Sequence, residues 1–232
     1  MKFSKTLLFV LLICLVFPIA SYAGQLEDGT AAMDKGDYTT AYKLLFPLAE
    51  NGNASAQDCI GAMYGEGLGV AKDESQAFGW YEKAALQGNA KSQNALGAMY
   101  VNGLGVEKDL QKGLSYIVKA AQQGLKTAQQ NAYALYYQQA QEGNMGALHN
   151  VGLMCLKGWG GEVDPNNCVK LLEMAAQNGF IKSASTLERL YEEGKFGIKA
   201  DAQKSAYWKN FAENPPAPTP AATEPAAASS TN

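Results

Sequence analysis

Side chains that commonly carry chemistry are few and widely spaced in this sequence. His149 is the only histidine, and beyond Cys14 the chain has three cysteines, Cys59, Cys155 and Cys168. A metal site would have to rely on carboxylates or cysteines, and no group of residues has metal-ligand spacing. The chain also lacks the Gly-x-Ser-x-Gly and Ser-x-x-Lys motifs of activated serines. We therefore expect no catalytic residue, no metal and no cofactor.

Two glycine loops resemble phosphate-binding loops at first sight. They are Gly67-Leu68-Gly69 and Gly103-Leu104-Gly105. Each follows a predicted helix, whereas phosphate-binding loops follow a strand, and each helix after them starts with an aspartate. We interpret both as loops between helices.

The chain begins with the pattern of a secretory signal peptide. Lys2 and Lys5 precede the apolar run Leu7–Val16, and Ser21-Tyr22-Ala23 forms a cleavage site. The run is too short for a membrane-spanning helix. We expect residues 1–23 to be removed, the chain to be periplasmic or secreted, and the mature chain not to insert into a membrane.

The charge of the mature chain argues against nucleic acid as a partner. Loss of Lys2 and Lys5 changes the formal net charge from −3 to −5, and Arg189 is the only arginine. Nucleic-acid binding usually requires a basic patch, and none is visible. Export also implies an oxidising compartment, in which one pair of the three remaining cysteines can form a disulfide.

The stretch Ala56–Ala90 recurs directly afterwards as Ser92–Leu125, which indicates a repeat protein. Apolar residues return at helical spacing on both sides of its glycine loop, at Ile60, Met63, Tyr64, Ala77, Trp80, Tyr81, Ala84 and Ala85. The stretch therefore predicts a helix, a loop, a second helix and a turn.

Single residues sharpen this prediction. Asp73 is expected to cap the second helix, with Gln76 in capping-box position, and Gly88-Asn89 to end it. Gly61 has no side chain and is expected to let the two helices approach closely, opposite the small Ala77. Its recurrence as Gly97 favours a packing role.

The same pattern predicts an all-α fold of helical hairpins stacked into a solenoid, at about 25–53, 54–89, 90–125, 145–181 and 182–213. Pro47 predicts a kink or an early stop in the first hairpin. Lys126–Glu142 interrupts the pattern and predicts either one long helix or two short ones with a compressed turn. In the last hairpin Glu188 replaces the packing glycine, and the loop has one extra residue. Residues 214–232, rich in Pro and Ala, are predicted to be disordered.

These residues resemble the Sel-1-like repeat family, a relative of the tetratricopeptide repeats. The first copy carries the family pattern at Ala56, Ile60, Gly61, Tyr64, Gly67, Gly69, Val70, Asp73, Ala77, Trp80, Tyr81, Lys83, Ala84, Ala85 and Gly88. The second carries it at Leu96, Gly97, Tyr100, Gly103, Gly105, Val106, Asp109, Tyr116, Lys119, Ala120, Ala121 and Gly124. Fewer positions match over 145–179, 182–213 and 25–53, and the pattern fails over 126–144.

The resemblance implies a right-handed superhelix of αα-hairpins whose concave face holds a protein or peptide partner. Exported members are similar to scaffolds, adaptors, host-interaction factors, or inhibitors of a cognate toxin or enzyme. Cysteine-rich members are linked to β-lactam binding and hydrolysis, and such a hydrolase is the alternative here. This chain lacks their regular cysteine pair in each repeat. Neither the partner nor the oligomeric state follows from the resemblance.

The family fold also implies roles for particular residues. Cys155 and Cys168 fall at positions that face each other in one hairpin, which predicts a disulfide and leaves Cys59 free. The first helix of each hairpin is expected to line the concave face with Asp58, Glu66, Asn94, Val101, Asn102, His149, Asn150, Lys157, Arg189 and Glu193. Trp159 lies in an interhelical loop outside the repeat pattern, and we predict it to be exposed and to contact the partner.

Overall fold

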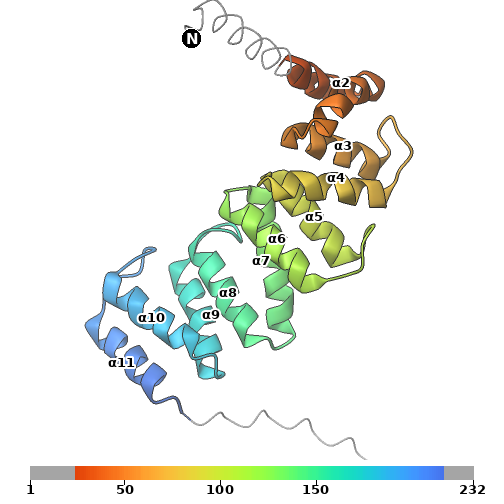
Figure 1. Ribbon diagram of the computed structural model, residues 1–232. Coiled ribbons are helices and arrows are strands. Elements are labelled where there is room, and N and C mark those ends of the chain that lie inside the picture. The colour runs from red at the N-terminus through yellow and green to blue at the C-terminus, as the bar shows by residue number, and fades with distance from the viewer. Residues whose placement is uncertain (1–23, 217–232) are drawn as a thin grey trace, which may run out of the picture. The chain divides into compact units, whose positions relative to one another are not determined.

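A computed structural model describes residues 24–216, and the regular secondary structure of these residues is helical (Figure 1). The predicted signal peptide and residues 217–232 of the predicted tail lie outside the described residues. The described chain divides into two compact units, residues 24–129 and 130–216. Each unit is built from helical hairpins and is described by itself.

The first unit contains three hairpins. In the first hairpin, residues 24–34 are helical and are followed by α2. The later hairpins pair α3 with α4 and α5 with α6, and the bounds are α2 (Tyr38–Glu50), α3 (Ala54–Glu66), α4 (Glu74–Leu86), α5 (Ala90–Asn102) and α6 (Leu110–Gln122). Pro47 lies inside α2, which continues to Glu50 without the predicted early stop.

The second unit contains two further hairpins, α8 with α9 and α10 with α11. Their bounds are α8 (Met145–Leu156), α9 (Pro165–Gln177), α10 (Lys182–Glu193) and α11 (Ala202–Glu213). The irregular segment before them forms one helix, α7 (Lys126–Gln141), rather than two short ones. Gln139 on α7 has a buried Nε2 atom with no hydrogen-bond partner in the described chain.

Helix caps explain where most of these helices begin. Asparagines cap the first helices of three hairpins, Asn53 before α3, Asn89 before α5 and Asn144 before α8. Aspartates cap the second helices, and Asp73 accepts a hydrogen bond of 2.9 Å from the Gln76 amide, as predicted. Such side-chain caps satisfy amide groups that the first turn of a helix leaves unpaired.

The glycines of the first helices allow close contact within each hairpin. A Cβ atom on Gly61 would lie 2.9 Å from the Tyr81 ring, and one on Gly97 would lie 2.5 Å from Ile117. At Gly152 the same atom would lie 2.8 Å from Leu172. At Gly61 the nearest atoms are those of the Tyr81 ring, which the prediction did not name. Ala77 lies close to the same helix one turn further on, where its Cβ is 3.5 Å from the position of a Cβ on Gly65.

In four hairpins the two helices are also joined near the loop that connects them. The Asp73 amide donates to the Tyr64 carbonyl at 2.9 Å, and Asp109 and Asp201 make the same bond to Tyr100 and Tyr191, each at 2.8 Å. The α8–α9 hairpin carries the predicted disulfide, in which Cys155 and Cys168 have Cα atoms 5.4 Å apart.

Buried glutamines join neighbouring hairpins in the first unit. Gln57 donates to the Ala49 carbonyl at 3.0 Å, and its own side-chain oxygen accepts from Gln87 at 2.8 Å. The pattern repeats one hairpin later, where Gln93 donates to the Ala85 carbonyl and accepts from Gln123. We call this chain of bonds the glutamine ladder. It satisfies polar groups that would be costly to bury without partners.

The packing glycines generate a first prediction. Gly97→Ala should lower the free energy of unfolding by about 1–3 kcal/mol, because its methyl group would collide with Ile117 and with the Gly113 carbonyl, 2.8 Å away. Gly79→Ala is the matched control, since Gly79 is helical and has nothing within 4 Å of its Cβ position. This change should stabilise the protein by up to about 1 kcal/mol. Urea denaturation measures both, and equal effects would contradict the packing role.

The disulfide generates a second prediction. Replacing Cys155 and Cys168 by serine should lower the free energy of unfolding by about 2–3 kcal/mol, because the bridge restricts the unfolded chain over a separation of 13 residues. Cys59→Ser keeps the bridge and should have a much smaller effect. Intact-mass measurement after alkylation of unreduced mature protein should show one labelled thiol. Three labelled thiols would show that the bridge is absent.

Candidate functional site

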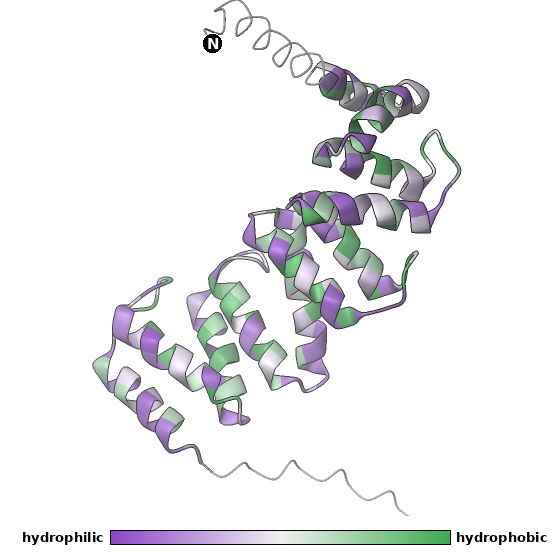
Figure 2. Ribbon diagram, in the orientation of Figure 1, coloured by the Kyte–Doolittle hydropathy of each residue, from purple (hydrophilic) through white to green (hydrophobic). Residues whose placement is uncertain are grey.

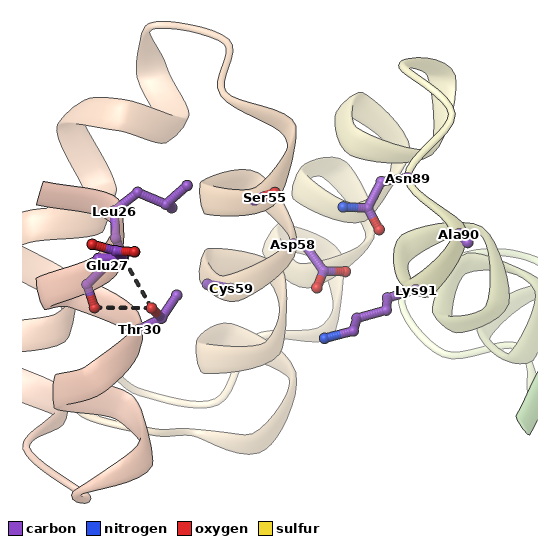
Figure 3. Close-up of a pocket in the computed structure, with 9 residues that line it drawn as sticks. All are labelled: Leu26, Glu27, Thr30, Ser55, Asp58, Cys59, Asn89, Ala90 and Lys91. Atoms are coloured by element: carbon purple, nitrogen blue, oxygen red, sulfur yellow. Dashed lines mark hydrogen bonds between the residues drawn. The ribbon is translucent and has the colours of Figure 1, made fainter. Parts of the chain in front are cut away.

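A groove of about 460 Å³ crosses the first helices of the three hairpins in the first unit (Figure 3). We call it the first-helix groove. Its walls come from the helical residues 24–34, from α3 and from the start of α5, and its lining residues are Leu26, Glu27, Thr30, Ser55, Asp58, Cys59, Asn89, Ala90 and Lys91. Of the residues predicted to bind a partner, Asp58 lies in this groove.

Asp58 is a partly buried carboxylate between two hairpins. The Ser92 hydroxyl on α5 donates to it at 2.5 Å. Burial raises the pKa of Asp58, while this hydrogen bond and the Lys91 ammonium act in the opposite direction. Figure 3 shows the side chains of Asp58 and Lys91 directed into the same space. The groove therefore presents both an acidic and a basic group to whatever enters it.

Cys59 is the free cysteine of the described chain, and it is half-buried in the groove wall. Burial, and then the negative charge of Asp58, raise its pKa to about 11. The thiolate is the nucleophilic form of cysteine, so this thiol is largely unreactive at neutral pH. Cys59 therefore lines the groove as a neutral thiol at neutral pH.

The other predicted residues of the first unit lie in different surroundings. Glu66 is exposed near the end of α3. Burial, and then the charges of Asp58 and Glu66, raise the pKa of the half-buried Tyr81. Asn102 is exposed and donates to the Ala98 carbonyl, while Asn94 is half-buried. Val101 leans on α6, because its side chain would touch a Cβ at Gly113. It packs within its hairpin instead of facing solvent.

His149 does not lie on an open face. Its side chain is 2% exposed, and its Nδ1 lies 2.9 Å from the Ser183 hydroxyl on α10. The Phe180 ring packs beside the imidazole, with centroids 5.1 Å apart. His149 and Ser183 occupy the repeat positions that Asp58 and Ser92 hold in the first unit. The pair is therefore a link between two hairpins, and the predicted solvent-facing position of His149 is wrong.

Trp159 is also buried, contrary to prediction. Its side chain is 9% exposed, its amide donates to the Met154 carbonyl, and the Lys157 ammonium lies 5.6 Å from its ring centroid. The loop that contains Trp159 packs closely against α7. A Cβ on Gly160 would lie only 2.6 Å from the Tyr133 ring. A tryptophan held in this way is a packing residue, and the basis for its predicted contact with a partner is lost.

The remaining predicted residues stay accessible in the second unit. Lys157, Arg189 and Glu193 are exposed, and Asn150 is half-buried. Glu193 pairs with Lys195 at 2.6 Å, and this bond lowers the pKa of Glu193. None of these residues belongs to the first-helix groove. The structure thus does not bring the predicted binding residues together as one site within a unit.

Two arrangements of side chains bear on metal binding and nucleophilic chemistry. Among residues 24–216, no three His, Cys, Asp or Glu side chains are placed to share a metal ion. The His149–Ser183 pair resembles a catalytic dyad in its atoms, but Ser183 is fully buried and its hydroxyl cannot meet a substrate. In the same part of the chain, no helix is both long and apolar enough to cross a membrane.

Sequence reasoning missed several residues of the groove, notably Leu26, Glu27, Thr30 and Lys91. They lie near the starts of the first helices, whereas the prediction counted outward from the packing glycines in the middle of each helix. The repeat alignment gave no signal for the bond between Asp58 and Ser92, because the counterpart of Asp58 one repeat later is Asn94. The bond joins polar residues of two neighbouring first helices.

The arrangement of hairpins defines the chain as an αα-repeat protein of the solenoid class. The family profile of the Sel1 repeat matches residues 54–89, 90–125, 146–180 and 185–208. This chain belongs to the Sel1 repeat family. Proteins built from these repeats typically bind other proteins.

Solved structures include two clear sequence relatives. A Sel1 repeat protein from Oxalobacter formigenes is 30% identical, and the match covers 81% of this chain and 84% of that one, with a TM-score of 0.45. A protective antigen of uropathogenic Escherichia coli with an SLR fold is 28% identical, with a TM-score of 0.47. That match covers 83% of this chain but only 46% of the antigen. None of the curated proteins matches this chain.

The burial of His149 generates a third prediction. Burial, and then the Lys182 ammonium, lower its pKa below the ordinary 6.5. The unfolded chain therefore takes up a proton at a higher pH than the folded chain. The stabilisation from the neutral imidazole is complete above pH 6.5 and is lost as the pH falls from there through the folded pKa.

The His149→Gln variant keeps a hydrogen-bonding group for Ser183 but does not titrate. Urea denaturation at several pH values between about 5 and 8 should show a steeper acid-side loss of stability for the wild type than for this variant. Parallel pH profiles for the two proteins would contradict the assignment.

Proposed function

We propose that this chain is an exported, non-catalytic scaffold or adaptor that holds a segment of a protein partner in the first-helix groove. The observation that carries the proposal is the groove itself, about 460 Å³, lined by three successive first helices. Membership of a family that typically binds proteins supports the same reading. An inhibitor of a cognate toxin or enzyme would use the same kind of contact.

The chemistry of the groove supports peptide recognition. Leu26, Ala90 and the neutral Cys59 thiol supply apolar contacts, while Asp58 and Lys91 supply an acceptor and a donor that set orientation. A small number of fixed polar groups within an apolar surface is the usual composition of a recognition site. The raised pKa of Cys59 and the burial of Ser183 speak against the alternative hydrolase.

Export is supported by two independent features. The sequence begins with the pattern of a signal peptide, and the Cys155–Cys168 disulfide is of a kind that persists in oxidising compartments. Periplasmic residence and secretion share both features, and cell fractionation of the native protein distinguishes them.

Asp58 provides the fourth prediction. Its raised pKa means that the carboxyl group stabilises the fold below its unfolded value of 3.8, and that this stabilisation is lost as the pH rises through the folded pKa. Asp58→Asn should therefore raise stability at neutral pH while weakening partner capture. That combination is typical of a residue that serves function at the expense of stability.

Site-specific photocrosslinking in intact cells measures the capture. A photoreactive residue in place of Ser55, on the groove wall, should give an adduct of one defined mass. The same residue in place of Ser115, exposed on α6, is the control and should give none. Asp58→Asn should reduce the Ser55 adduct. Equal adducts at both positions, or an adduct insensitive to Asp58→Asn, would refute the proposed groove contact.

A further inference from the structure

The last hairpin departs from the others at the point where its two helices should be closest. Its backbone bond from Asp201 to Tyr191 corresponds to the bonds from Asp73 to Tyr64 and from Asp109 to Tyr100. This correspondence places Glu188 where the earlier hairpins have their packing glycine. It places Lys209 where they have the bulky residue that covers the glycine.

The replacement changes which side chains meet at this point. At Gly61, Gly97 and Gly152 a Cβ would lie 2.5–2.9 Å from the facing side chain, whereas the last hairpin has two long charged side chains, Glu188 and Lys209, at the corresponding places. Between α10 and α11 the structure has a cleft of about 600 Å³. We call it the terminal cleft. It is lined by Glu188, Tyr191, Glu192, Ala200, Asp201, Ala202, Ser205, Ala206 and Lys209.

The charges in the terminal cleft are mostly negative and incompletely paired. Glu188 and Glu192 lie one turn apart on α10, where like charges repel. Within residues 24–216, no ion pair joins Lys209 to either glutamate, and the two ion pairs found there involve other residues. Asp201 already accepts from the amides of Gln203 and Lys204. The two glutamates therefore remain available to an incoming cation.

The apolar part of the cleft suits the stem of a long basic side chain. Ala200, Ala202 and Ala206 line it with methyl groups. Lysine and arginine bury an aliphatic stem along such a surface while the charged end stays with polar groups. Figure 1 shows α10 and α11 side by side, and Figure 2 shows hydrophilic residues on both helices.

We propose that the terminal cleft is a second docking site, which takes a lysine or arginine side chain from an extended segment of a protein partner. Charge complementarity selects this occupant. Residues 214–232 of this chain carry one charged residue, Glu224, and no lysine or arginine, so they lack the required cation. The site lies wholly within the second unit and does not depend on the first-helix groove.

The experiment uses the full mature chain and a fluorescein-labelled peptide of alternating lysine and alanine. Fluorescence anisotropy gives the dissociation constant, and a peptide of alternating glutamine and alanine tests the requirement for charge. Glu188→Gln with Glu192→Gln should weaken binding of the lysine peptide by about fivefold, the loss of two partly exposed charge contacts. Glu162→Gln with Glu213→Gln is the matched control. It removes the same charge from exposed positions of the second unit outside the cleft and should change binding less than twofold.

A second variant changes the geometry of the cleft as well as its charge. Glu188→Gly restores the packing glycine and should weaken binding more than Glu188→Gln does, while thermal melting shows a folded protein. Amide shifts in two-dimensional NMR should locate the bound peptide at α10 and α11.

Three results would overturn the proposal. Equal losses in the cleft variant and its charge-matched control would show general attraction to an acidic protein. Peptide-induced shifts confined to α3 and α5 would place the peptide in the first-helix groove. A dimer in sedimentation analysis that is lost with Glu188→Gln and Glu192→Gln would identify the occupant as a second copy of the chain. Retained binding in Asp58→Asn, with loss in the cleft variant, separates this proposal from the proposed function.

Discussion

The close contact between two helices at a glycine is the constraint on which each regular hairpin depends. Gly61, Gly97 and Gly152 let a side chain from the second helix lie directly on the backbone of the first. This contact sets the spacing of the two helices, and the asparagine and aspartate caps set where each begins. The core of each hairpin, including Ile60, Leu96 and Leu172, then fills the space that remains.

Polar contacts decide how one hairpin is placed on the next. In the first unit the glutamine ladder and the Asp58–Ser92 bond supply them, and in the second unit the His149–Ser183 bond does so. Hydrogen bonds are directional, so they fix register more strictly than apolar contact does. The same repeat position can therefore carry aspartate, as at Asp58, or histidine, as at His149, and still bond to a serine of the next hairpin. The surface next to this bond differs between the two units.

Much of the fold could be predicted because its determinants are local. The glycines, the caps and the helical spacing of apolar residues act within one hairpin, and the Cys155–Cys168 bridge followed from the repeat alignment. The burial of His149 and Trp159 could not be predicted in this way. It depends on Ser183 from the next hairpin, on Phe180 in the connection after α9, and on a loop that packs against Tyr133. The single helix α7 was one of two readings of a segment that has no internal glycine or proline to mark a turn. The first-helix groove was missed in part because it is formed where three helices begin, and no one repeat contains it.

The glutamine ladder also bears on what happens when the stack of hairpins opens. Gln57, Ser92 and Gln93 occupy buried positions between hairpins that a more apolar repeat would fill with leucine or valine. When a hairpin detaches by thermal fluctuation, these side chains form hydrogen bonds with water. They expose less apolar surface than leucine or valine would at the same positions. At these positions, partial opening of the first unit therefore exposes groups whose hydrogen bonds water can replace.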